Sequence, residues 1–235
     1  MKLYLSSQFD KDGPESLQIL RDWAKKHNRV ALIPNAKDME EPEKIAGSVS
    51  KYTAILQGLG FEVSVLDLKD YFNQPEALHK AAEPFRTFFA LGGGCYTLRQ
   101  AMKLSGFDDF LHSISNSNDY LYAGFSASAM VLAKNIDCLK LSPLNAIDNV
   151  YDTTHGHCPV DGGLGFIDYM PVVHYDENMK EHRQKRLEFL IANNRPHRLL
   201  RDGKAIVVDT KTGHERFYPL QPRPEAGETG NQHIR

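Results

Sequence analysis

The chain lacks the features that mark membrane and secreted proteins. No apolar run approaches the roughly 18–20 residues that span a bilayer, and the first residues contain too short an apolar stretch for the core of a signal peptide. Cysteine is rare: there are 3 among 235 residues, an odd number that does not favour a disulfide scaffold. These absences predict a soluble cytoplasmic protein that does not interact with membranes.

An excess of basic residues is also missing. The 28 Lys and Arg residues are balanced by 30 Asp and Glu residues, whereas binding to nucleic acid relies on a clear basic surplus. We therefore do not expect nucleic acid as a partner. The length and the ordinary globular composition favour one domain. We expect a single α/β hydrolase-type domain over residues 1–222, followed by a disordered tail over residues 223–235, which show no periodicity.

Short apolar runs alternate with segments of helical periodicity. Several runs are apolar on both faces, as in parallel strands that helices cover on each side. Alternation of strands and helices predicts a three-layer α/β sandwich with a mostly parallel central sheet. In addition, the Asp202-Gly203 pair lies between two apolar runs and predicts a C-terminal hairpin over residues 197–209. The expected strands are residues 2–6, 29–34, 61–68, 87–91, 120–125 and 169–174.

Ser126 lies between small residues where the predicted strand at 120–125 passes into a helix. This pattern is typical of a nucleophile elbow, in which a strained turn exposes the serine hydroxyl above the sheet. The N–H of Ala127, at the start of that helix, is placed to stabilise an oxyanion. From the local pattern alone, a serine that caps the helix is about equally consistent.

Gly92, Gly93 and Gly94 follow the predicted strand at 87–91. Consecutive glycines let backbone N–H groups face a ligand, at an entropic cost that a plain turn would not require. We therefore favour an oxyanion loop over a simple turn. The general base that a serine nucleophile needs is expected to be His174, at the end of the strand at 169–174, where the catalytic layer of such folds lies. A structural histidine at a strand end is the alternative.

His155, His157 and Cys158 are close in sequence and could suggest a metal site. A structural zinc site normally has four ligands, and no second Cys/His pair with suitable spacing is present. We expect no metal and no other cofactor.

Taken together, these motifs resemble peptidase E and its relatives. The resemblance rests on Gly-Gly-Gly-x-Tyr at residues 92–96, Gly-x-Ser-Ala-x-Ala at residues 124–129 and Pro-x-x-His-Tyr at residues 171–175, and it covers most of the chain. The family comprises serine peptidases, among them aspartyl dipeptidase and cyanophycinase, with a fold like that of class I glutamine amidotransferases. Its members hydrolyse short peptides without a cofactor, and some prefer an acidic residue at the amino end.

The resemblance implies a role for each matched residue. Ser126 takes the position of the nucleophile, His174 that of the base, and Gly93, Gly94 and Ala127 that of the oxyanion hole. A triad carboxylate is expected some fourteen or fifteen residues after the serine, but Lys140 and Leu141 occupy those positions.

The nearest acids to those positions, Asp137 and Asp148, are therefore the candidates for the third triad member. Cys95 and Ser128 also replace the asparagine and glycine that are common in the family.

The sequence thus predicts a serine-type peptidase that acts on small peptides. The alternative, motivated by Cys95, Ser128 and Lys140, is a catalytically weak relative that binds a small molecule or a protein in the same cleft. A cysteine hydrolase using Cys95 is less favoured, because this residue follows the glycine loop rather than occupying an elbow. A homodimer is an option that the sequence does not decide.

Overall fold

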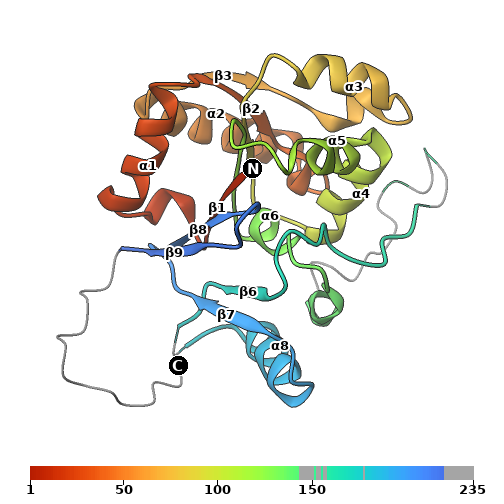
Figure 1. Cartoon of the computed structure of the whole chain (residues 1–235). Helices are drawn as coiled ribbons and strands as arrows, with labels where there is room; N and C mark the ends of the chain where they lie inside the picture. Colours follow the sequence, from red (N-terminus) through yellow and green to blue (C-terminus); the bar gives the residue numbers. More distant parts are fainter. Residues whose placement is uncertain (143–150, 152–154, 156–157, 177, 220–235) are drawn as a thin grey trace.

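The computed structural model describes residues 1–142, 151, 155, 158–176 and 178–219. Its centre is a seven-stranded sheet with the strand order β3-β2-β4-β5-β1-β8-β9 (Figure 1). The first five strands in that order are parallel, and β8 and β9 are antiparallel to their neighbours. The strands are β1 (Lys2–Ser6), β2 (Arg29–Ile33), β3 (Glu62–Val65), β4 (Thr87–Ala90), β5 (Leu121–Phe125), β8 (Ala205–Asp209) and β9 (Glu215–Tyr218).

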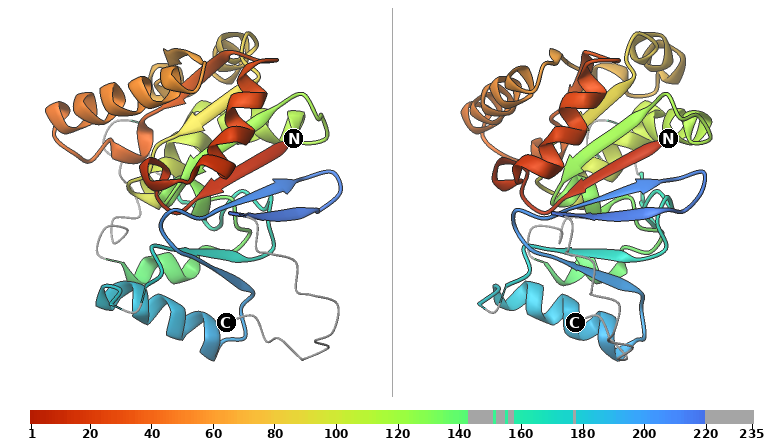
Figure 2. Two further views of the ribbon diagram at one scale, coloured as in Figure 1. Left: turned by 90° about the vertical axis from the view of Figure 1, so that its left-hand side faces the viewer. Right: turned by 60° about the vertical axis from the view of Figure 1, so that its left-hand side comes forward.

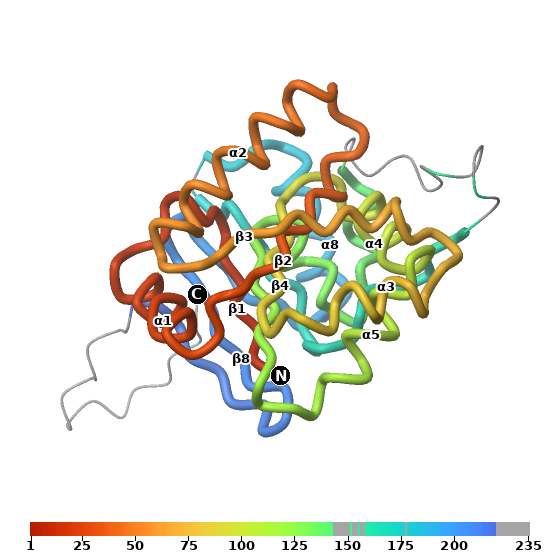
Figure 3. Tube along the Cα trace, turned by 90° about the horizontal axis from the view of Figure 1, so that it is seen from above, coloured from red at the N-terminus to blue at the C-terminus, as the bar shows by residue number. Residues whose placement is uncertain are grey.

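The central strands bury both faces, since successive side chains of a strand point to opposite sides of the sheet. In β4, Phe88 packs into one apolar cluster and Phe89 into the other. Helices α1 (Pro14–Ala24) and α2 (Pro42–Gly58) contribute to the cluster around Phe89. The opposite face is covered by α3 (Pro75–Ala82), α4 (Cys95–Ser105) and α5 (Phe107–Ile114) (Figure 3). The predicted three-layer sandwich is confirmed.

A second, two-stranded sheet lies beside the main one. It consists of β6 (Met170–Val173) and β7 (His197–Leu200), which are parallel and connected through α8 (Glu181–Ala192). Figure 2 shows these three elements together below the main sheet. The strand predicted at 169–174 therefore forms, but it belongs to the second sheet and not to the main one.

The hairpin predicted over residues 197–209 is wrong. The two apolar runs flank a turn at Asp202-Gly203, but β7 pairs with β6, whereas β8 pairs with β1 and β9. The C-terminal hairpin is instead formed by β8 and β9. A turn motif fixes how the chain reverses locally, whereas the strand partner depends on which sheet edge is open. The tail predicted at 223–235 lies outside the described residues.

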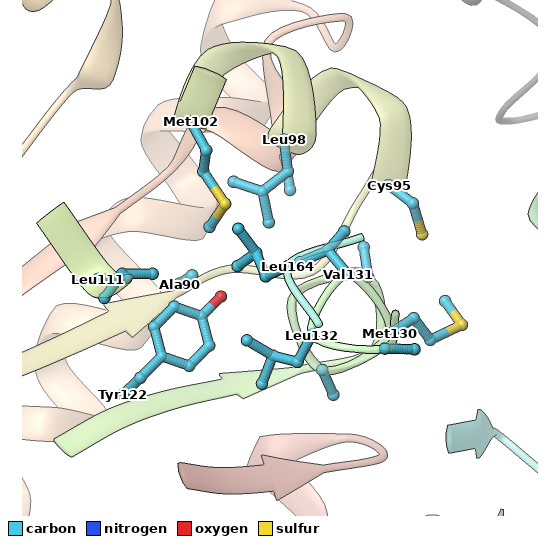
Figure 4. Packing of buried hydrophobic residues seen from close by; sticks show 14 of the residues in the cluster. Ala90, Cys95, Leu98, Met102, Leu111, Tyr122, Met130, Val131, Leu132 and Leu164 are labelled. Carbon is cyan, nitrogen blue, oxygen red and sulfur yellow. The ribbon is translucent and has the colours of Figure 1, made fainter. Parts of the chain in front are cut away.

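The core beneath the predicted elbow is close-packed. Tyr122, Leu98, Val131 and Leu164 converge there from different segments of the chain, as Figure 4 shows, and none of these side chains is more than 4% exposed. Burying a side chain of this size contributes about 1.5–3 kcal/mol. The packing therefore fixes the end of β5 and the start of the following helix. Among the described residues, no helix has the length and apolar character needed to cross a membrane.

Candidate active site

Ser126 occupies a strained turn between β5 and the short helix α6 (Ala127–Met130). Its backbone has φ 53° and ψ −115°, a conformation that a residue with a side chain rarely adopts. The Ser126 N–H donates to the carbonyl oxygen of Ser6 at 3.1 Å, which ties the turn to the end of β1. The helix-cap alternative is not supported, since Ser126 makes no side-chain capping hydrogen bond to α6.

Two neighbours make this turn compatible with the core. At Gly124, an added Cβ would lie only 2.5 Å from Ser128 Oγ, so the position tolerates no side chain. Ser128 is fully buried, and its Oγ accepts from the Phe125 N–H at 2.8 Å. The same hydroxyl lies 2.8 Å from the Ala90 carbonyl and 2.9 Å from that of Phe125. Ser128 therefore joins the ends of β4 and β5.

His174 follows β6 directly and also has a positive φ, of 54°. Its backbone N–H donates to Ser7 Oγ at 2.7 Å, which fixes the residue against the segment after β1. The ring nitrogen Nε2 lies 3.1 Å from Ser126 Oγ. The structure thus brings together the two residues that the sequence analysis paired as nucleophile and base.

The other ring nitrogen of His174 meets a carboxylate that the sequence analysis missed. Nδ1 lies 2.7 Å from Asp202 Oδ1. The parallel register pairs Val173 with Leu200, and the Tyr175 N–H continues this pairing by donating to the Leu200 carbonyl at 3.2 Å. The two strands therefore end together, which places residue 174 beside the turn that holds Asp202.

The turn itself is held in place by the segment that follows β1. Ser7 Oγ donates to Asp202 Oδ1 at 2.9 Å, and Lys11 Nζ lies 3.0 Å from Asp202 Oδ2. Gly203 adopts φ 80°, and a Cβ there would come within 3.1 Å of the Lys11 carbonyl oxygen. Because Gly203 has no side chain, the turn packs closely against Lys11. This packing places the Asp202 carboxylate beside the His174 ring.

Of the two acids that the sequence analysis considered, the structure describes Asp137, which does not occupy this position. Asp137 begins a 3₁₀ helix, Asp137–Leu141, and lines a different cavity of about 400 Å³. The carboxylate on the His174 ring is Asp202, and Asp148 lies outside the described residues. Counting from the serine could not find Asp202. Asp202 lies two residues after the end of β7. Since functional residues gather at the carboxyl ends of strands in such folds, this position is the signal that could have identified Asp202.

Lys140 does not take the place of the triad acid. It is exposed, and its Nζ lies 6.0 Å from the centroid of the Tyr96 ring. The cations whose fields act most strongly on His174 are Arg183 and Lys11.

The charges at this site favour an ionised acid beside a neutral base. Burial opposes ionisation of Asp202, but hydrogen bonds from Lys11, Ser7 and His174 outweigh it and lower the pKa of the carboxyl group. Burial lowers the pKa of His174, and the fields of Arg183 and Lys11 add to this, whereas Asp202 raises it; the net shift is downward. A neutral imidazole is therefore available near pH 7 to accept a proton from Ser126.

The glycine loop approaches the short 3₁₀ helix after β2, Asn35–Lys37, very closely. A Cβ at Gly93 would lie 2.1 Å from the carbonyl oxygen of Ala36, so a side chain cannot be accommodated without moving the loop. The Gly94 N–H donates to that same oxygen at 2.6 Å. Because this hydrogen bond occupies the Gly94 N–H, the prediction that Gly94 contributes to an oxyanion hole is corrected. Within the part of the chain that the structure describes, the Gly93 N–H has no such acceptor.

Of the remaining sequence candidates, the structure describes His155, Cys158 and Cys95. The His155 ring packs edge-on against Phe72 at 4.8 Å, and His157 lies outside the described residues. No group of three or more His, Cys, Asp or Glu side chains able to hold a metal occurs among the residues described. Cys95 is 1% exposed and packs in the core, as Figure 4 shows, which does not support it as a nucleophile.

The fold of this chain is similar to those of two solved peptidase structures. The structure superposes on a candidate peptidase E from Listeria monocytogenes EGD-e with a TM-score of 0.70 and 20% sequence identity, covering 94% of this chain and 98% of the other. A peptidase from an acI-B1 actinobacterium gives a TM-score of 0.61 and 15% identity, covering 88% of this chain and 82% of the other. Both similarities concern the fold. No curated protein sequence matches the chain.

The model of peptidase family S51 matches residues 3–216 of the sequence. The chain therefore belongs to peptidase family S51, and the resemblance noted in its motifs is confirmed. The protein is accordingly assigned to the hydrolases.

Proposed function

We propose that this protein is a cytoplasmic serine peptidase that hydrolyses short peptides, with Ser126 as nucleophile, His174 as general base and Asp202 as the acid that orients the histidine. The observation that carries the proposal is the continuous chain of contacts from Ser126 Oγ to His174 Nε2 at 3.1 Å and from His174 Nδ1 to Asp202 Oδ1 at 2.7 Å. A serine hydroxyl becomes an effective nucleophile when such a base removes its proton.

In the proposed reaction, Ser126 Oγ attacks the peptide carbonyl carbon while its proton moves to His174 Nε2. The imidazolium that forms is stabilised by the ionised Asp202. The developing oxyanion receives hydrogen bonds from the N–H groups of Gly93 and Ala127. His174 then protonates the leaving amine, the C–N bond breaks, and water hydrolyses the acyl-enzyme by the reverse proton transfers. The chain's own groups and water account for every step.

The charge around the site bears on the choice of substrate. Arg183 and Lys11 both act on His174 through their positive fields, and Arg183 is itself influenced by Asp202 and Asp176. A positive potential beside the nucleophile favours anionic substrates. We therefore include in the proposal a preference for anionic peptides; an acidic residue at the amino end is the form of this preference that the resemblance to peptidase E implies.

The test is labelling with a fluorophosphonate probe, which reacts with an activated serine, combined with hydrolysis of a dipeptide panel. We expect the purified protein to be labelled at Ser126 and to hydrolyse members of the panel. Ser126→Ala should lose both signals, and Ser113→Ala, which alters an exposed serine on α5, should retain both.

Absence of labelling and hydrolysis in the folded wild-type protein would contradict the proposal. That outcome would support the alternative of a relative that only binds ligands in this cleft.

A further inference from the structure

A buried carboxylate adjoins the proposed triad without belonging to its chain of contacts. Asp12 is 8% exposed and directly follows the 3₁₀ helix Phe9–Lys11. The hydroxyl of Tyr4 donates to Asp12 Oδ2 at 2.7 Å, and the hydroxyl of Ser6 donates to Asp12 Oδ1 at 2.8 Å. Tyr4 and Ser6 are fully buried alternate residues of β1, so both present their hydroxyls on the same face of the strand.

Asp12 is held by these hydroxyls and not by a cation. Within the described part of the chain it forms no salt bridge, and two lysines of this region bind other acids: Lys11 binds Asp202 and Lys51 binds Asp10. Burial raises the pKa of Asp12 to about 7, and the fields of Asp10 and Asp202 add to this, although the two hydrogen bonds oppose it. A buried carboxyl group opposes folding unless hydrogen bonds compensate for its desolvation. The two hydroxyl contacts therefore determine where Asp12 lies.

The hydrogen bond from Ser6 to Asp12 closes a short loop of the chain. The residues just inside its two ends are the ones that hold the triad acid, since Ser7 follows Ser6 and Lys11 precedes Asp12. Ser7 Oγ donates to Asp202 Oδ1 at 2.9 Å, and Lys11 Nζ lies 3.0 Å from Asp202 Oδ2. Each oxygen of one carboxylate is thus held from a different end of the loop, and closure of the loop sets the separation of the two donors.

The backbone of the same loop also contacts the nucleophile and the turn that carries the triad acid. The Ser6 carbonyl oxygen accepts the Ser126 N–H at 3.1 Å, and the Ser7 N–H donates to the Lys204 carbonyl at 3.3 Å. The loop that Asp12 closes therefore touches both ends of the contact chain.

We propose that Asp12 is a positioning residue for the triad: by closing this loop, it sets the two donors that hold Asp202 against the His174 ring. The inference rests on the proposed function and deepens it, because it extends the catalytic arrangement to a residue that touches neither the substrate nor the reacting atoms. Misplacement of a catalytic group by about 1 Å can cost about 10²-fold in rate. Opening the loop should therefore lower kcat and leave KM nearly unchanged.

The test begins with two substitutions at Asp12. Asp12→Ala removes both acceptors and opens the loop, whereas Asp12→Asn resembles the neutral acid and keeps an oxygen that can accept from Ser6. We expect Asp12→Ala to lower kcat about 10²-fold with KM within about twofold of wild type, and we expect Asp12→Asn to restore most of this loss. Asp10→Ala is the matched control, because it removes the neighbouring exposed acid that is paired with Lys51, and it should keep the wild-type kcat. Urea denaturation checks that each variant is folded.

A double-mutant cycle with Asp202→Asn separates positioning from a general loss of stability. If Asp12 acts through Asp202, the interaction that it positions is already lost in Asp202→Asn, so the two effects are not additive. We expect Asp12→Ala to lower the kcat of Asp202→Asn by less than about threefold further. If Asp12→Ala does not fold, Ser6→Ala takes its place in the cycle, because it removes only the hydroxyl that closes the loop.

NMR titration of the His174 ring provides a readout that does not need turnover. Asp202 raises the pKa of His174 against the effects of burial, Arg183 and Lys11, so a displaced Asp202 should lower the titration midpoint in Asp12→Ala. The midpoint should stay at its wild-type value in Asp10→Ala, and Asp12→Ala should not lower it further in Asp202→Asn.

A wild-type kcat in folded Asp12→Ala, additive losses in the cycle, or an unchanged His174 midpoint would overturn the proposal. Fluorophosphonate labelling of wild-type Ser126 reports separately on the proposed function. If the wild-type protein is not labelled, the titration alone decides whether Asp12 positions Asp202, so the two ideas can fail independently.

Discussion

The imidazole of His174 contacts the carboxylate of Asp202, with Nδ1 and Oδ1 2.7 Å apart across 28 residues of sequence. The contact is made by the parallel ends of β6 and β7, not by a local motif. Both residues are also hydrogen-bonded to Ser7 Oγ, one through its backbone N–H and one through its carboxylate. A single hydroxyl after β1 thus fixes the relative position of the histidine and its acid.

Asp202→Asn should therefore lower kcat by several orders of magnitude. The amide cannot stabilise the imidazolium and favours the wrong tautomer, a loss that can reach about 10⁴-fold in such triads. Steady-state kinetics on the best dipeptide measures it. Asp137→Asn is the control, because Asp137 lies on another cavity, and it should stay within about twofold of wild type. A larger loss in the Asp137 variant than in the Asp202 variant would refute the assignment.

The rate should depend on pH through His174. Burial and nearby cations lower the pKa of this residue, and only its neutral form can accept the serine proton. The rate should therefore rise with pH through an apparent pKa below 6.5 and then level off.

Arg183→Gln tests the cause of this shift. Removing a cation that lowers the pKa of His174 should move the rising limb of the pH profile to higher pH. Lys185→Gln, on an exposed position of α8 paired with Glu181, should leave the limb in place. A rate with no rising limb at any pH at which the protein stays folded would exclude His174 as the base.

Gly93→Ala should reduce kcat while leaving the protein folded. The added Cβ would meet the Ala36 carbonyl oxygen at 2.1 Å, so the loop must move and its N–H must leave the position proposed for the oxyanion hole. Loss of one such donor costs about 10²–10³-fold in kcat. Gly47→Ala, in open space on α2, provides the matched control and should not change kcat. Similar kinetics in the two variants would remove Gly93 from the oxyanion hole.

Ser128→Ala should destabilise the fold. The substitution leaves the buried N–H of Phe125 without the Oγ that accepts from it, and an unsatisfied buried donor costs about 1–3 kcal/mol. Urea denaturation would measure the change in the free energy of unfolding. Ser113→Ala removes the hydroxyl of an exposed residue, which donates to the Phe110 carbonyl within its own helix, and should change stability by less than about 0.5 kcal/mol. Equal stability of the two variants would show that the Ser128 hydroxyl does not hold the ends of β4 and β5 together.

The sequence by itself determined the elements whose signals are local. Apolar runs and helical periodicity predict the strands and the three layers, because each residue's burial repeats with the period of its own element. Ser126 could be located in the same way, since an elbow needs small residues such as Gly124 at fixed offsets from the serine.

Only the tertiary structure decided which carboxylate completes the chain of hydrogen bonds. Asp202 lies in an Asp-Gly turn, and a turn has the same local signature whether its two strands pair with each other or enter different sheets. Here β7 joins β6 and β8 joins β1, so the turn crosses between two sheets and places Asp202 beside His174. The sequence likewise could not predict the hydrogen bond from the Gly94 N–H to the Ala36 carbonyl, because this bond depends on how closely the segments after β2 and β4 approach each other. Contacts between distant segments are set by packing, which no local pattern encodes.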